Sequence, residues 1–190
     1  MEAFLISLST VALAEMGDRT QLLSLLLATR FRRPWPILAG VFVATLANHG
    51  LAGVVGVLIG HQLKPAILDA AVGISMIGMS LWMLKPDELD ENDGKRTQRG
   101  IFLTTLVAFF IAEIGDKTQI ATVALAAGYS NLPAVVAGTT CGMIAANAPV
   151  IFLGNAFAGR LPMRAIHYVT TVLLLGIGAA FIYRAIHNWD

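Results

Sequence analysis

Charged residues are scarce in this chain of 190 residues: they account for 13% of it, while hydrophobic residues account for 56%. A soluble domain usually carries about 25% charged residues. A soluble domain of this size could not bury so much apolar surface, whereas a lipid bilayer covers such a surface. The composition therefore excludes an ordinary soluble protein, and the apolar stretches leave no room for a separate soluble domain.

Thiols and imidazoles are scarce as well. The single cysteine, Cys141, cannot form an intrachain disulfide, and His49 is the only histidine near the middle of an apolar stretch. Cu(I) and Zn²⁺ favour these softer ligands, so a dedicated site for either ion is not expected. The sequence also lacks a nucleophile–base pair and an H-E-x-x-H motif, and we expect neither an enzyme nor a prosthetic group.

Six apolar stretches dominate what the sequence does contain. They cover residues 3–29, 35–60, 66–85, 100–128, 133–158 and 164–186. A helix that spans a bilayer needs roughly 20 apolar residues, so we predict an all-α membrane protein with six transmembrane helices. Its surroundings are then the lipid bilayer. We expect no nucleic-acid partner, and the oligomeric state is left open.

Two segments share one pattern: E-M-G-D-R-T-Q, which begins at Glu15, and E-I-G-D-K-T-Q, which begins 98 residues later at Glu113. The same offset matches Gly40 with Gly138, so the similarity extends beyond the motif and indicates two three-helix repeats. Because each repeat crosses the membrane an odd number of times, the second enters from the opposite side. Such inverted-topology repeats are typical of secondary transporters. The predicted organisation is a first repeat at 1–85, a charged linker at 86–99 and a second repeat at 100–190.

The connections between the predicted helices differ in charge. Lysines and arginines gather in the connections after the first, third and fifth helices: Arg30, Arg32, Arg33, Lys85, Lys95, Arg96, Arg99, Arg160 and Arg164. The opposite side carries only Lys64 and Arg184. Loops rich in lysine and arginine stay in the cytoplasm. We therefore expect these three loops, the linker included, to be cytoplasmic and both termini to lie outside.

The repeated motif places charges in the middle of the first and fourth predicted helices. A charge at that depth costs a few kcal/mol even on lenient scales, so these side chains must face the interior and be paired or bind a ligand. Residues three apart in the motif can share one helical face. Under inverted symmetry the two faces can meet, and we predict an oxygen-rich site for a hard cation such as Mg²⁺, Ca²⁺ or Mn²⁺. The predicted ligands are Glu15, Asp18, Gln21, Glu113, Asp116 and Gln119.

The two motifs together hold four acids and two bases, which leaves a formal charge of −2. That charge matches one divalent cation or two protons, and metal binding to carboxylates releases protons. A proton/divalent-cation exchanger follows as a hypothesis, whereas purely structural salt bridges would need equal numbers of acids and bases. Arg19 and Lys117 either pair with Glu15 and Glu113 four residues away, or reach elsewhere and stabilise the unloaded site.

Further polar residues are candidates for a second layer around the site: Thr20, Thr118, Asn48, His49 and Asn147. Each type has an alternative role. The threonines can bond back to their own helix, the asparagines can hold helices together, and the histidine can relay protons or fill the core. Gly17 and Gly115 weaken the helix inside each motif, which makes partial unwinding there a further expectation.

E-M-G-D-R-T and E-I-G-D-K-T resemble the twin E-x-G-D-[KR]-[TS] signature of the Golgi-type calcium/manganese cation-exchanger family. The resemblance covers nearly the whole chain, and both copies fit without departure. It implies metal binding by Glu15, Asp18, Glu113 and Asp116, transport of Mn²⁺ or Ca²⁺ against protons, and a place in the bacterial inner membrane. Mn²⁺ export is the first expectation. The alternatives are a Ca²⁺/H⁺ antiporter, a passive cation channel, a membrane scaffold and an amino-acid exporter.

Overall fold

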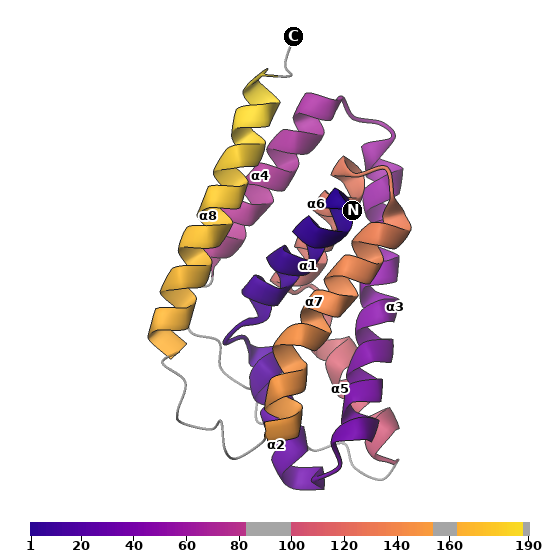
Figure 1. Cartoon of the computed structure of the whole chain (residues 1–190). Helices are drawn as coiled ribbons and strands as arrows, with labels where there is room; N and C mark the ends of the chain where they lie inside the picture. The colour runs from indigo at the N-terminus through magenta and orange to yellow at the C-terminus, as the bar shows by residue number, and fades with distance from the viewer. Residues whose placement is uncertain (83–99, 154–162, 188–190) are drawn as a thin grey trace.

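The computed structural model describes residues 1–82, 100–153 and 163–187, and the predicted linker at 86–99 lies outside them. Within these ranges the chain forms helices and no strands, which confirms the predicted all-α class. The helices in chain order are α1 (Glu2–Glu15), α2 (Arg19–Phe31), α3 (Pro34–Gly60), α4 (Pro65–Trp82), α5 (Ile101–Glu113), α6 (Lys117–Gly128), α7 (Leu132–Leu153) and α8 (Met163–His187). Figure 1 shows them side by side as one bundle.

Four of the six predicted helices are continuous. The bounds of α3, α4, α7 and α8 agree with the apolar stretches to within five residues at each end, and α3 and α7 are long and apolar enough to cross a membrane unaided. The first and fourth predicted helices are each broken in two, so the expectation of a single helix there was wrong. The breaks fall at residues 16–18 and 114–116, inside the repeated motif.

The breaks follow from the residues of the motif. Gly17 and Gly115 have φ angles of 82° and 75°, a left-handed conformation that glycine adopts without the steric cost of a Cβ atom. The next residue, Asp18 or Asp116, is extended and occupies the N-cap position of the following helix, where the Asp116 side chain accepts from the Thr118 amide. Three residues later the Gln21 Oε1 accepts a hydrogen bond from the Gly17 amide at 2.9 Å. Partial unwinding of the motif is therefore confirmed.

The two halves of the chain pack through matching contacts. A Cβ atom added to Gly40 of α3 would meet Thr105 and the Phe102 carbonyl of α5. One added to Gly138 of α7 would meet Ser7 and the Phe4 carbonyl of α1. Both pairs of partners are 98 residues apart. The long helix of each half thus packs on the first short helix of the other half.

The contact between α4 and α8 is reciprocal in the same way. Gly73 of α4 lies against the Gly178 carbonyl of α8, and the Thr171 hydroxyl of α8 donates to the Ser80 carbonyl of α4 at 3.3 Å. Gly73 and Thr171 are equivalent positions of the two repeats, and so are Ser80 and Gly178, because each pair is 98 residues apart. In Figure 1 the chain runs downward through α1–α2, upward through α3 and downward through α4, and it runs upward through α5–α6, downward through α7 and upward through α8.

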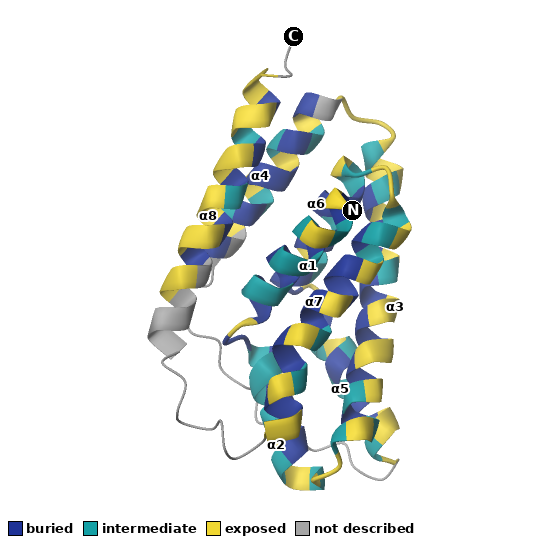
Figure 2. Ribbon diagram, in the orientation of Figure 1, coloured by how far each residue is buried: buried dark blue, intermediate teal, exposed yellow. Residues whose placement is uncertain are grey.

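Burial is arranged as in a membrane protein. The outer faces of the helices are exposed (Figure 2), and on α3 they carry large apolar side chains such as Leu51, Val54 and Leu58. The interior holds charged side chains, including those of Glu15 and Lys117. Water would favour the opposite arrangement, because exposed apolar surface is unfavourable there, whereas lipid favours this one.

Candidate metal centre

The two helix breaks bring four carboxylates into the interior. Glu15 and Glu113 are the last residues of α1 and α5, and Asp18 and Asp116 cap α2 and α6. Each of the four is at most 4% exposed. The predicted shared helical face was wrong, because α1 ends at Glu15 and the chain turns before Asp18. The unwound turn, rather than helical spacing, is what orients these acids.

Three of the carboxylates converge. One oxygen from each of Glu15, Asp18 and Asp116 lies within 4.8 Å of the others, and this trio draws on both halves of the chain. Its donor set is oxygen only, as Mg²⁺, Ca²⁺ and Mn²⁺ prefer. Glu15 Oε2 accepts from the Thr20 hydroxyl, while Glu15 Oε1 is buried with no hydrogen-bond partner in the described part of the chain. A buried oxygen without a partner is available to a cation.

Glu113 is held apart from this trio. Its Oε1 accepts from the Thr45 hydroxyl at 2.7 Å and its Oε2 accepts from the Asn48 amide at 3.2 Å. Both donors come from α3, and the Asn48 amide also reaches the Phe110 carbonyl at 3.1 Å. The sequence pattern did not single out Thr45, although its position three residues before Asn48 puts both side chains on one face of a helix.

The two basic side chains pair across the halves. Lys117 Nζ donates to Asp18 Oδ1, and Arg19 Nη2 lies 3.4 Å from Asp116 Oδ1 and donates to the Ala112 carbonyl at 2.6 Å. Pairing with Glu15 and Glu113 along the same helix was therefore the wrong alternative. The other alternative, in which the bases reach elsewhere, agrees with the structure. Each base offsets an aspartate that the opposite half contributes.

The glutamines of the motif act on the backbone. Gln21 Oε1 and Gln119 Oε1 accept from the Gly17 and Gly115 amides at 2.9 and 2.8 Å. Gln21 Nε2 also donates to the Ala146 carbonyl of α7 at 2.9 Å. These bonds satisfy amides that the break exposes, much as a capping box does. Both amide oxygens are thus occupied, although each was predicted as a ligand.

The second-layer candidates have different surroundings. The Thr118 hydroxyl lies 3.1 Å from Asp116 Oδ2, so it supports the trio directly. Asn147 Oδ1 accepts from the Ser24 hydroxyl at 2.6 Å and its Nδ2 donates to the Met143 carbonyl at 3.1 Å, which ties α2 to α7. His49 is fully buried, and neither ring nitrogen has a hydrogen-bond partner among the described residues.

Each half of the chain has one helix break and contributes to the ion pairs between the halves. Each half also matches a known protein family separately. The family model described as "Divalent cation/proton antiporter GDT1" matches the chain twice, at residues 3–91 and 101–189. The chain belongs to the GDT1 family. This confirms the family that the twin motifs indicated, and it places the protein in a family of antiporters rather than of enzymes. The two matches are offset by the same 98 residues as the motifs.

Relatives across the GDT1 family cover almost the whole chain. A Vibrio cholerae protein named "Putative manganese exporter" is 50% identical over 95% of this chain and 92% of its own length. The GDT1-like protein sll0615 of Synechocystis is 28% identical over 100% of this chain and 97% of its own. GDT1-like protein 3 of Oryza sativa subsp. japonica is 26% identical over 94% and 73%. No solved structure matches the chain significantly.

Proposed function

We propose that this GDT1-family protein exports Mn²⁺ from the cytoplasm in exchange for protons, with Glu15, Asp18 and Asp116 as the ligands in the conformation described. The observation that carries the proposal is the buried oxygen trio built from both halves of the chain. The name and the 50% identity of the Vibrio cholerae relative favour Mn²⁺ as the cargo. The cargo is a transported substrate, and the site chemistry alone suits Ca²⁺ equally well.

The proposed topology has six membrane passes in two inverted repeats, at 1–85 and 100–190, joined by the linker at 86–99. Support comes from the reciprocal contacts of α4 with α8 and from the opposite chain directions of matching helices (Figure 1). Helices broken near mid-depth are typical of transporters whose repeats enclose the substrate. From the charge bias of the loops we propose that those at the ends of α2, α4 and α7 are cytoplasmic and that both termini lie outside. The similarity to the Vibrio cholerae relative supports a bacterial inner membrane as the location.

Exchange follows from competition for the same oxygens. In the structure Lys117 and Arg19 each contact one oxygen of Asp18 and Asp116, and a divalent cation that takes these same oxygens displaces the bases. Carboxylates take metal only when deprotonated, so protons leave as the metal arrives and return as it departs. The site therefore alternates between a metal-loaded form and a proton-loaded form, which is the requirement for antiport.

Glu113 has a separate place in this cycle. Thr45 and Asn48 hold both of its oxygens in the conformation described, whereas the matching positions on α7 are Met143 and Ala146, which cannot donate a side-chain hydrogen bond. The two halves are thus unequal at this point. We assign Glu113 to the metal in the opposite-facing conformation of the alternating-access cycle, after α3 releases it.

Flux of Mn²⁺ into proteoliposomes, with and without an imposed pH gradient, tests the proposal. A gradient should drive uphill Mn²⁺ movement in the parent protein, and Glu15→Gln or Asp116→Asn should abolish it. Glu2→Gln, a change at an exposed acid, is the control. Flux that ignores the gradient would indicate a channel, preferential flux of Ca²⁺ would indicate a Ca²⁺/H⁺ antiporter, and normal flux in both site variants would refute the site.

A further inference from the structure

His49 is an unusual residue to bury without a partner. Its side chain lies in α3, which is otherwise apolar over most of its length, and both ring nitrogens lack a hydrogen-bond partner in the described part of the chain. An imidazole always offers at least one N–H donor. Leaving such a group unmet in the interior costs about 1–3 kcal/mol. The other nitrogen of the neutral ring carries a lone pair that can bind a metal ion, and in His49 no described residue occupies it.

The residue of the other half that corresponds to His49 does have hydrogen-bond partners. Asn147 corresponds to His49 at the repeat offset, and both its oxygen and its nitrogen are bonded, to Ser24 and Met143. Ser24 corresponds to Thr122, but the Thr122 hydroxyl donates to the Thr118 carbonyl of its own helix at 2.8 Å. The two halves therefore differ at this position: among the described residues, the Asn147 side chain has hydrogen-bond partners and the His49 ring has none.

The location of His49 follows from its neighbours on α3. One turn earlier, Thr45 bonds to Glu113. One turn later, Gly53 faces the junction of α6 and α7, where a Cβ atom would meet Ala126, Leu132 and Val136. A turn of helix advances about 5.4 Å. His49 thus lies on the side of α3 that faces this junction, one turn beyond the layer of the carboxylates.

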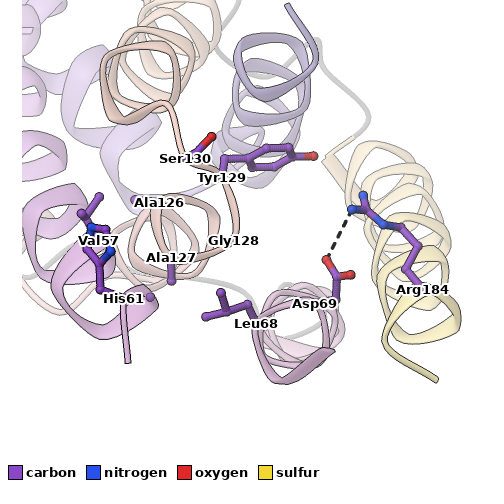
Figure 3. A pocket seen from close by; sticks show the side chains of 11 residues that line it. Val57, His61, Leu68, Asp69, Ala126, Ala127, Gly128, Tyr129, Ser130 and Arg184 are labelled. Atoms are coloured by element: carbon purple, nitrogen blue, oxygen red, sulfur yellow. Dashed lines mark ion pairs between the residues drawn. The ribbon is translucent and has the colours of Figure 1, made fainter. Parts of the chain in front are cut away.

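The contact between α3 and α6 continues from here to a cavity. Further along α3, Gly56 and Gly60 lie against the backbone carbonyls of Val123 and Ala127, so the helices approach closely with no bulky side chain between them. At the end of this contact lies a cavity of about 370 Å³, whose lining includes Val57 and Gly60 of α3 and Ala126 of α6. Figure 3 shows Asp69 and Arg184 paired on its far side, at 3.6 Å. Along α3, His49 therefore lies between Thr45, which contacts a carboxylate, and the residues that line this cavity.

We propose that His49 is a nitrogen ligand for the exported metal ion on its way from the carboxylates toward the cavity, and that it favours transition-metal ions over Ca²⁺ and Mg²⁺. The inference rests on the proposed function. Ca²⁺ and Mg²⁺ take oxygen ligands, whereas first-row divalent ions also bind an imidazole nitrogen. The oxygen trio does not discriminate between these classes, and His49 supplies the element that does.

The test replaces His49 with the residue that the other half uses. Mn²⁺ flux is measured for the parent and for His49→Asn in proteoliposomes with a pH gradient, together with the Ca²⁺ concentration that halves that flux. The ratio of this concentration to the KM for Mn²⁺ should fall at least about tenfold, since removing even an indirect metal partner costs 10–100-fold. His187→Asn, a change at an exposed histidine of α8, should leave the ratio unchanged.

The outcomes separate the two proposals. A parent protein without gradient-driven flux refutes the proposed function itself. A parent that exchanges Mn²⁺ for protons, with a His49→Asn variant whose ratio equals that of the parent, overturns only the role of His49. If His49→Asn does not fold, His49→Gln is measured in the same way. Loss of folded protein in both variants assigns the ring a packing role and overturns the proposal.

Discussion

Lys117 offers a direct test of the idea that a metal ion and a protein cation compete for one oxygen. Its side chain is 2% exposed, and that of its partner Asp18 is 1% exposed. Removing one member of a buried pair costs about 3–5 kcal/mol, because the remaining charge is left uncompensated. For a protein of this size each kcal/mol lowers Tm by roughly 2–4 °C, so Lys117→Gln should lose about 6–20 °C in metal-free detergent solution.

Mn²⁺ should restore much of that loss. In the variant the ion binds Asp18 without displacing an ammonium group, so it binds more tightly than in the parent. At a concentration 100 times the Kd, ligand binding stabilises a folded protein by about 2.7 kcal/mol. We therefore expect a given Mn²⁺ concentration to raise the Tm of Lys117→Gln by more than it raises the Tm of the parent.

The measurement is thermal unfolding followed by intrinsic fluorescence across a Mn²⁺ titration. Lys64→Gln is the matched control, because Lys64 is exposed beyond the end of α3 and its loss should change Tm by little. Competition at Asp18 would be refuted if Lys117→Gln kept the Tm of the parent without metal. It would also be refuted if Mn²⁺ raised both Tm values equally.

Two further predictions concern glycines. Gly115→Ala should destabilise the protein by about 1–2 kcal/mol, because the positive φ of this residue is unfavourable for alanine while a Cβ atom there meets no neighbour. Gly50 is equally open but helical, so Gly50→Ala should leave the free energy of unfolding unchanged or raise it. Chemical denaturation measures both variants. Gly40→Ala should cost about 1–3 kcal/mol by overpacking, because its Cβ atom would come within 2.7 Å of Thr105. Gly176→Ala, which meets nothing, is the control, and equal unfolding midpoints for the two would contradict the close packing of α3 on α5.

The site carries an asymmetry that matters for transport. Glu15 and Glu113 are equivalent in the repeat, yet Glu15 joins the trio while Thr45 and Asn48 bind Glu113. Under the proposed alternating-access cycle, this difference makes the two conformations unequal in the oxygens that they offer to the metal. The polar pair on α3, which α7 does not reproduce, keeps the two glutamates in different environments.

Local pattern was enough for the four continuous helices and for the set of acids. Long apolar stretches end where the loops begin, so the bounds of α3 and α7 follow from composition. The duplicated motif identified all four carboxylates, because a charge at mid-depth in an apolar helix is costly unless it is paired or binds a ligand. Even the unwinding could be anticipated from Gly17 and Gly115. The length of the unwound turn could not, since it depends on how Gln21 and Gln119 cap the exposed amides.

By itself, the sequence determined that this is a duplicated, helical membrane protein with four acids and two bases inside its apolar stretches. Only the tertiary structure decided which of them meet: Lys117 with Asp18 across the repeats, Arg19 with Asp116, and Glu113 with α3 instead of the trio. The physical reason is the range of the interactions. Helix formation and burial in lipid depend on neighbours in the chain, whereas an ion pair between residues 99 apart depends on how whole helices pack.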